Sequence, residues 1–101
     1  MHSVIRNLSL TLVLSSAAFA ADATAGKAVY STKCKTCHGA DGTPAAFAKT
    51  MGAKPINDPS LQAKSDADLK ASILKGVGKM KAQPISDADA DNVVAALRTM
   101  K

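Results

Sequence analysis

The sequence predicts an all-α domain with three main helices joined by loops, and three observations support this fold class. Two segments begin with a capping box, in which a serine is followed three residues later by an aspartate, at 65–68 and at 86–89. In the stretch 22–34, Gly26 and Cys34 lie on one helical face, because they are two intervals of four residues apart. We find no segment with the apolar alternation of a half-buried strand.

Residues 1–20 have the pattern of a signal peptide that is cleaved after Ala20. Arg6 precedes an uncharged apolar run, 8–19, and small residues stand at 18 and 20, where signal peptidase requires them. The alternative is a membrane anchor, but the run is shorter than the ~20 apolar residues that a spanning helix needs. We therefore expect a domain of residues 21–101, without stable membrane insertion, exported to the periplasm or to another such compartment, for example a thylakoid lumen.

The domain that remains has a thin core and a mildly basic charge. Tyr30 and Phe47 are its only aromatic residues, and chains of about eighty residues usually need a staple such as a metal or disulfides. Its formal charge falls from +5 to +4 when Arg6 is removed. This charge favours acidic partner proteins, whereas the lack of an arginine cluster and of an aromatic stacking platform argues against nucleic acid.

The first helix is expected over 22–34, where Asp22 or Thr24 can cap its start. Glycine is less favourable than alanine inside a helix by about 1 kcal/mol. We therefore expect Gly26 to have a packing role, such as the close approach of another helix. The alternative is a glycine that is tolerated near a helix start.

This helix leads into Cys34, Cys37 and His38, within the sequence CKTCH. The Cys-x-x-Cys-His motif is the attachment pattern of a c-type haem. Each thiol adds across one vinyl group at the same edge of the porphyrin, and the histidine then lies beneath the ring, where its imidazole can bind the iron. A thioredoxin-like redox pair would need a βαβ context, a zinc site would need four ligands, and a structural disulfide is the plainest alternative. One covalently bound haem c explains both the motif and the thin core.

The segment from Gly39 to Ser60 is rich in glycine and proline and contains one asparagine, which predicts a loop with one short helical turn near 45–50. A loop of this length is unusual unless it wraps something, and we expect it to wrap the haem edge. We further expect the Pro44 carbonyl to accept the Nδ1 proton of His38, which would orient the ligand. A rigid turn at the proline is the alternative.

The second and third main helices are expected over 66–75 and from about 87 to 100. Ser65 caps the second helix and Gly76 ends it. The third helix has apolar residues at helical spacing. The apolar positions are Leu69 and Ile73 in the second helix, and Ala90, Val93, Val94, Leu97 and Met100 in the third.

Elimination favours Met80 as the second axial ligand of the iron, opposite His38. The other histidine, His2, lies in the signal segment. Met100 belongs to the apolar face of the last helix, where a core role is expected. Met80 lies in a short loop, 76–84, that glycine and proline keep from forming a regular helix. Met51 and Lys79 remain as alternatives.

Ligation by methionine and histidine predicts an electron carrier and no enzymatic activity. The thioether raises the reduction potential, and two axial ligands leave no open position for peroxide or oxygen. Two alternatives stay open. The chain can be a small haem subunit of a larger oxidoreductase, or a labile methionine bond can give peroxidase-like or gas-binding activity.

The sequence resembles the class I cytochromes c, especially the small soluble bacterial proteins with one haem. The resemblance rests on the pattern G-x-x-x-Y-x-x-x-C-x-x-C-H-G over 26–39, on the loop around Met80 and on the final helix. It implies the small class I cytochrome c fold, wrapped around one covalent haem c and carrying electrons. By resemblance, Gly26 and Tyr30 pack against Leu97 and Met100, and Pro44 is the proline that hydrogen-bonds the proximal histidine.

The sequence departs from the family pattern near the haem. Lys81 follows Met80 where relatives often have proline, and no tryptophan or tyrosine is placed to contact a haem propionate. The candidates for propionate contacts are then Lys49, Lys54, Asn57 and Gln62. Lysines 33, 35, 75, 79 and 81 flank the two ligand-bearing segments. We expect them to steer an acidic redox partner toward a monomeric carrier, or else to be scattered solvated charges.

Overall fold

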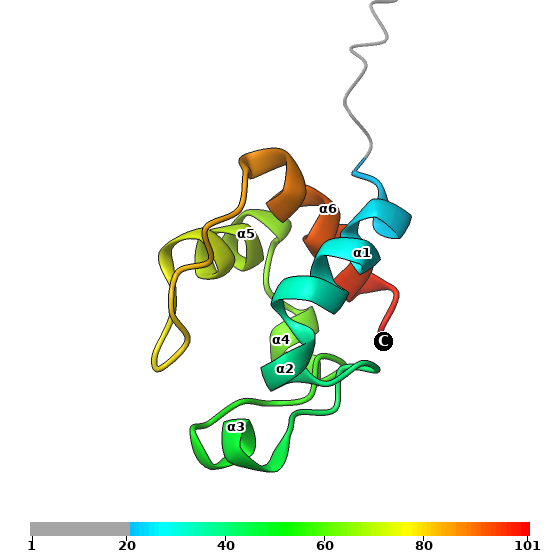
Figure 1. The fold of residues 1–101 in the computed structure, drawn as a ribbon. Coiled ribbons are helices and arrows are strands. Elements are labelled where there is room, and N and C mark those ends of the chain that lie inside the picture. Colours follow the sequence, from blue (N-terminus) through cyan, green and yellow to red (C-terminus); the bar gives the residue numbers. More distant parts are fainter. Residues whose placement is uncertain (1–20) are drawn as a thin grey trace, which may run out of the picture.

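The computed structural model describes residues 21–101, so the predicted signal peptide lies outside the described residues. Within them the chain is all-helical, and its only β-type pairing is one isolated bridge between Val77 and Met80. Figure 1 shows the helices in chain order. They are α1 (Ala23–Lys33), α2 (Lys35–His38), α3 (Ala46–Thr50), α4 (Pro59–Gln62), α5 (Asp66–Lys75) and α6 (Asp87–Arg98).

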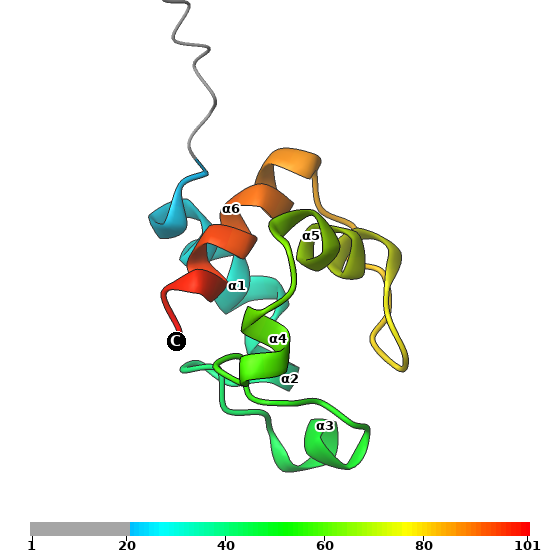
Figure 2. The same ribbon diagram turned by 180° about the vertical axis from the view of Figure 1, so that it is seen from behind.

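The first and last helices cross in backbone contact, and Figures 1 and 2 show them side by side from both directions. A Cβ atom on Gly26 would lie 1.8 Å from the carbonyl oxygen of Asn92. The Asn92 side chain also accepts a hydrogen bond from the Asp22 amide at 2.8 Å. The predicted packing role of Gly26 is confirmed. Its contact is with Asn92 and Val93, one turn earlier in α6 than the expected Leu97.

Local hydrogen bonds fix the N-terminal starts of the three main helices as the sequence indicates. The Asp22 carboxylate accepts from the amides of Thr24 and Ala25 at the start of α1. Both capping boxes form, because the Ser65 hydroxyl accepts from the Asp68 amide and the Ser86 hydroxyl accepts from the Asp89 amide, each at 3.0 Å. These bonds satisfy amides that a helix start would otherwise leave unpaired.

The buried core lies where α1, α5 and α6 meet. Leu69 and Ile73 of α5 are buried, as expected from their spacing. The other large members of the core cluster come from α1, α6 and the loop before α4; they are Tyr30, Ile56, Val93, Val94 and Leu97.

Arg98, at the end of α6, holds the connection between α4 and α5 in place. Its guanidinium donates to the carbonyls of Gln62 at 2.8 Å and Lys64 at 2.6 Å, and it contacts the Asp66 carboxylate at 2.8 Å. The Gln62 amide in turn donates to the carbonyls of Ile56 and Leu97. The short helix α4 is therefore fixed mainly by side chains that bond to backbone carbonyls.

Two helix ends and one additional helix differ from the sequence prediction. The expected helix over 22–34 ends at Lys33, and α2 begins after a break at Cys34. The last helix ends at Arg98, before Met100. α4 was not predicted, although Asp58 caps it and Pro59 stands at its first position, which is a recognised start signal. Within residues 21–101, no helix combines the length and the apolar character needed to cross a bilayer.

Candidate haem-binding site

The chemically reactive side chains predicted from the sequence line a single cavity of about 640 Å³. Cys34, Cys37, His38 and Met80 all contribute to its lining. In Figure 1, α1 and α2 lie on one side of this region and the loop that follows α5 lies on the other. The rest of the wall is largely apolar; it includes Ala48, Ile56, Leu61, Leu69, Ile73, Val93 and Leu97. Apolar walls and a few placed polar groups are typical of a cofactor pocket of this size.

The two cysteines are free thiols at the junction of α1 and α2. Cys34 is buried and Cys37 is exposed. Burial, and secondly the neighbouring Cys37, raise the pKa of the Cys34 thiol. A redox-active pair of the thioredoxin type needs a lowered thiol pKa, so this environment argues against that alternative.

His38 presents a neutral imidazole to the cavity. Burial lowers its pKa, and the neutral form is the one that binds a metal. Its Nδ1 atom is buried and has no hydrogen-bond partner. The bond predicted between this atom and the Pro44 carbonyl is therefore not formed in the structure. Pro44 itself is buried. For the haem-bound protein that bond stays a prediction.

Met80 stands on a tight turn held by its own backbone. The amide of Met80 donates to the Val77 carbonyl at 2.9 Å, and the Val77 amide donates to the Met80 carbonyl at 3.0 Å. Gly78 within the turn has a φ of 56°, a left-handed conformation that glycine adopts at little cost. The loop returns to α5 through a bond from the Gln83 amide to the Ile73 carbonyl at 2.8 Å.

Of the alternative ligands, Met51 and Lys79 also line this cavity, whereas Met100 lines a different groove beside Tyr30. Met51 follows α3 and its exposed fraction is 48%. The structure therefore removes Met100 from the candidate ligands. The sulfur atoms of Met51 and Met80 and the amine of Lys79 are left.

The residues present fit a haem c. Two thiols on consecutive helical turns stand beside a neutral imidazole, and a thioether lines the same apolar cavity. In the described part of the chain, no group of three or more His, Cys, Asp or Glu side chains is placed to hold a metal ion. A zinc site formed by these residues alone thus has no support there.

Lysines occupy much of the polar lining of the cavity; they are Lys33, Lys54, Lys64, Lys79 and Lys81. Among the expected propionate contacts, Lys54 lines the cavity, while Lys49, Asn57 and Gln62 do not. Sequence reasoning missed Ser60 and Lys64, which do line it. The Ser60 hydroxyl lies 3.4 Å from the Lys54 amine. Ser60 belongs to α4, so its place in the cavity wall could be expected only if that helix were predicted.

A family model described as cytochrome c oxidase, cbb3-type, subunit III, matches residues 21–95. The chain belongs to this family. It is a c-type cytochrome with the all-helical fold of these proteins, and its membership implies electron transfer and a covalently bound haem c.

Two solved structures are similar to this cytochrome. The KustC0563 c-type cytochrome is 30% identical, with a TM-score of 0.69 over 75% of this chain and 96% of that one. A tyrosine-to-phenylalanine mutant of the same protein is 28% identical, with a TM-score of 0.66 over 75% of this chain and 98% of that one. No curated protein matches the chain.

Proposed function

We propose that this cytochrome is a soluble periplasmic electron carrier with one haem c. Cys34 and Cys37 form the thioether bonds, and His38 and Met80 are the axial ligands. The haem supplies a one-electron couple. The observation that carries the proposal is the presence of all four side chains in the lining of one largely apolar cavity.

Each of these residues has a distinct task in the proposal. His38, kept neutral by burial, offers its nitrogen lone pair. The Met80 thioether favours the reduced state and raises the reduction potential relative to a second nitrogen ligand. The hydrogen-bonded turn holds the Met80 backbone beside the cavity that its side chain lines, and ligation by both His38 and Met80 would leave no open position for a substrate. Cys37 is exposed and would place one attached edge of the cofactor near the surface, where a partner can exchange electrons.

The absorption spectrum of the haem-loaded ferric protein tests this proposal. We expect the weak near-infrared band of sulfur ligation in the wild type, and its loss in Met80→Ala. Met51→Leu is the matched control, because it removes the other sulfur that lines the cavity. Loss of the band in Met51→Leu and its retention in Met80→Ala would transfer the role to Met51. A high-spin wild-type spectrum would refute the carrier function.

The lysines that line the cavity support a second part of the proposal, namely docking of an acidic redox partner. Lys79 and Lys81 flank Met80, and both are exposed. Positive charges around a reactive surface raise the association rate, and salt screens the effect. We expect the reduction rate to fall with ionic strength in the wild type and to become less salt-dependent in Lys79→Gln/Lys81→Gln. Lys27→Gln, which changes the groove beside Tyr30, should keep the wild-type salt dependence. A flat wild-type profile would contradict steering.

A permanent place in a larger oxidoreductase is the second candidate function. It is favoured by the description of the matching family, which names a subunit of a cytochrome oxidase. Purification of the tagged protein from its own cells distinguishes the two functions. A stoichiometric large partner that survives high salt would favour the subunit, and isolation of the cytochrome alone would favour the carrier.

A further inference from the structure

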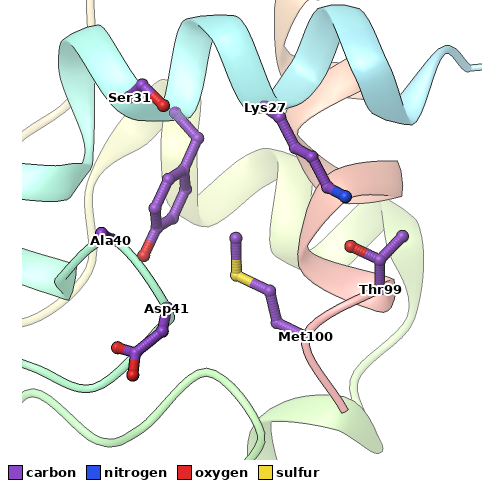
Figure 3. A pocket seen from close by; sticks show the side chains of 7 residues that line it. Lys27, Ser31, Ala40, Asp41, Thr99 and Met100 are labelled. Carbon is purple, nitrogen blue, oxygen red and sulfur yellow. The ribbon is translucent and has the colours of Figure 1, made fainter.

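Tyr30 forms the wall between the haem cavity and a second groove. In the part of the chain that the structure describes, it is the one residue that lines both hollows. The groove measures about 400 Å³ and lies between α1 and the end of the chain. Figure 3 shows the Met100 sulfur, the Asp41 carboxylate and the Lys27 amine around it. Tyr30 is nevertheless only 2% exposed, so its side chain lies within the protein.

The Tyr30 hydroxyl donates a short hydrogen bond, 2.6 Å, to the carbonyl oxygen of Gly39. Gly39 directly follows His38. Among the described residues, this is the one side-chain hydrogen bond made to the segment 34–39, which contains both cysteines and the histidine. The bond is part-buried, and a hydrogen bond is electrostatically stronger in the protein interior than in water.

Gly39 is also the point at which the chain changes direction after the motif. Its φ is 76°, and a Cβ there would lie 1.9 Å from the Thr43 carbonyl oxygen. Its carbonyl accepts a second, longer bond of 3.3 Å from the Gly42 amide, and the Gly42 carbonyl accepts from the Ile56 amide at 2.9 Å. The Tyr30 bond therefore fixes the first peptide of a turn that connects the motif to the loop before α4.

In the structure the buried Nδ1 atom of His38 has no hydrogen-bond partner, so the packing around the ring and the backbone that carries it orient the imidazole. In the haem-bound protein the predicted bond to the Pro44 carbonyl would add a restraint, and Pro44 follows Gly39 along the same turn. On the helical side that backbone is held by the bond from the His38 amide to the Cys34 carbonyl, 2.9 Å. On the other side the shortest restraint is the bond from Tyr30 to Gly39.

We propose that Tyr30 is a positioning residue for the axial histidine: its hydroxyl fixes the Gly39 carbonyl and thereby limits the orientations that the His38 ring can adopt. This inference rests on the proposed ligation of iron by His38. A purely structural role would require only the aromatic ring, and phenylalanine would then serve equally well.

The test compares Tyr30→Phe with Thr99→Val in the haem-loaded full-length protein. Both substitutions remove a hydroxyl that donates to a backbone carbonyl, at 2.6 Å for Tyr30 and 2.7 Å for Thr99. Both residues line the same groove, but Thr99 bonds within the end of α6. We expect a broadened ferric electron paramagnetic resonance signal and a shifted reduction potential in Tyr30→Phe only. Unfolding midpoints should fall by similar amounts in the two variants.

Unchanged resonance lines and potential in Tyr30→Phe would overturn the proposal, whatever the loss of stability. If that variant does not load haem, the wild-type protein still decides. The Tyr30 hydroxyl proton should be visible by nuclear magnetic resonance and should exchange slowly with water, whereas rapid exchange would overturn the inference. A wild-type protein without sulfur ligation would refute the carrier function alone, because the same comparison can be made on a high-spin ferric signal.

Discussion

Replacement of Gly26 by alanine places a methyl group where α1 and α6 are in backbone contact. The new Cβ would lie 1.8 Å from the Asn92 carbonyl oxygen, whereas ordinary contact begins at 3.4 Å. The obstacle is backbone, so a side-chain rotation cannot relieve it, and the helices must separate by about 1.6 Å at this point. Even a gap of 0.5–1 Å loses about a quarter to a half of the dispersion attraction between facing atoms.

The free energy of unfolding should therefore fall substantially. Overpacking costs about 1–3 kcal/mol and occasionally more, and a backbone obstacle places this site at the upper end of that range. The better helix propensity of alanine offsets about 1 kcal/mol. We expect a net loss of about 2 kcal/mol, which corresponds to a melting temperature lower by about 10 °C in a domain of this size.

Denaturant unfolding of the haem-loaded protein, followed by far-UV circular dichroism, measures this loss. Ala28→Gly is the control, because residue 28 is exposed on the same helix and reports the propensity contribution alone, about 1 kcal/mol. A Gly26→Ala protein as stable as the wild type would refute the close crossing of α1 and α6.

Three further predictions concern the scaffold around the cavity. Arg98→Met should lower the free energy of unfolding by about 1 kcal/mol, because it removes the hydrogen bonds to the part-buried Gln62 carbonyl and the exposed Lys64 carbonyl. Chemical denaturation measures this, and a loss equal to that of Asp66→Asn would mean that only the exposed ion pair matters. Ser86→Ala should cost about 1 kcal/mol through loss of the α6 cap, measured in the same way, and Ser86→Thr should retain most of it. In the haem-free protein, where Cys34 is a thiol, the pKa of Tyr30 should be about 12 instead of 10.0, because burial and the neighbouring Cys34 and Asp41 disfavour the phenolate. An unfolded chain loses this proton near pH 10 while the folded one keeps it, so stability falls as pH rises from 10 to 12. Since Tyr30 is the only tyrosine, the phenolate absorbance of the wild type, less that of Tyr30→Phe, should show one transition near pH 12, and a transition near pH 10 would contradict the buried environment.

Local signals in the sequence account for the well-predicted elements. The helix over 66–75 was predicted with its observed bounds because a capping box starts it and Gly76, with a φ of 83°, ends it. The start of α6 follows from the same kind of signal at Ser86. The glycine in α1 indicated a close helix contact, because its cost within a helix needs a compensating reason.

Features that depend on tertiary contacts were not predicted. The break between α1 and α2 at Cys34 has no glycine or proline to mark it. Gln62 was expected near a propionate, but its amide bonds to backbone carbonyls on two distant segments. The hydrogen bond between Tyr30 and Gly39 also joins residues whose contact depends on the turn after the motif. The sequence favours Met80 as the ligand, but Met51 lines the same cavity, so the spectra of the two variants decide between the two sulfur atoms.

Near-infrared magnetic circular dichroism of the haem-loaded ferric protein tests the central claim most directly, because the energy of the charge-transfer band identifies the pair of axial ligands. The account predicts the band of histidine–methionine ligation in the wild type and in Met51→Leu, with its disappearance in Met80→Ala. A band typical of two nitrogen ligands, or a high-spin signal in the wild type, would contradict it.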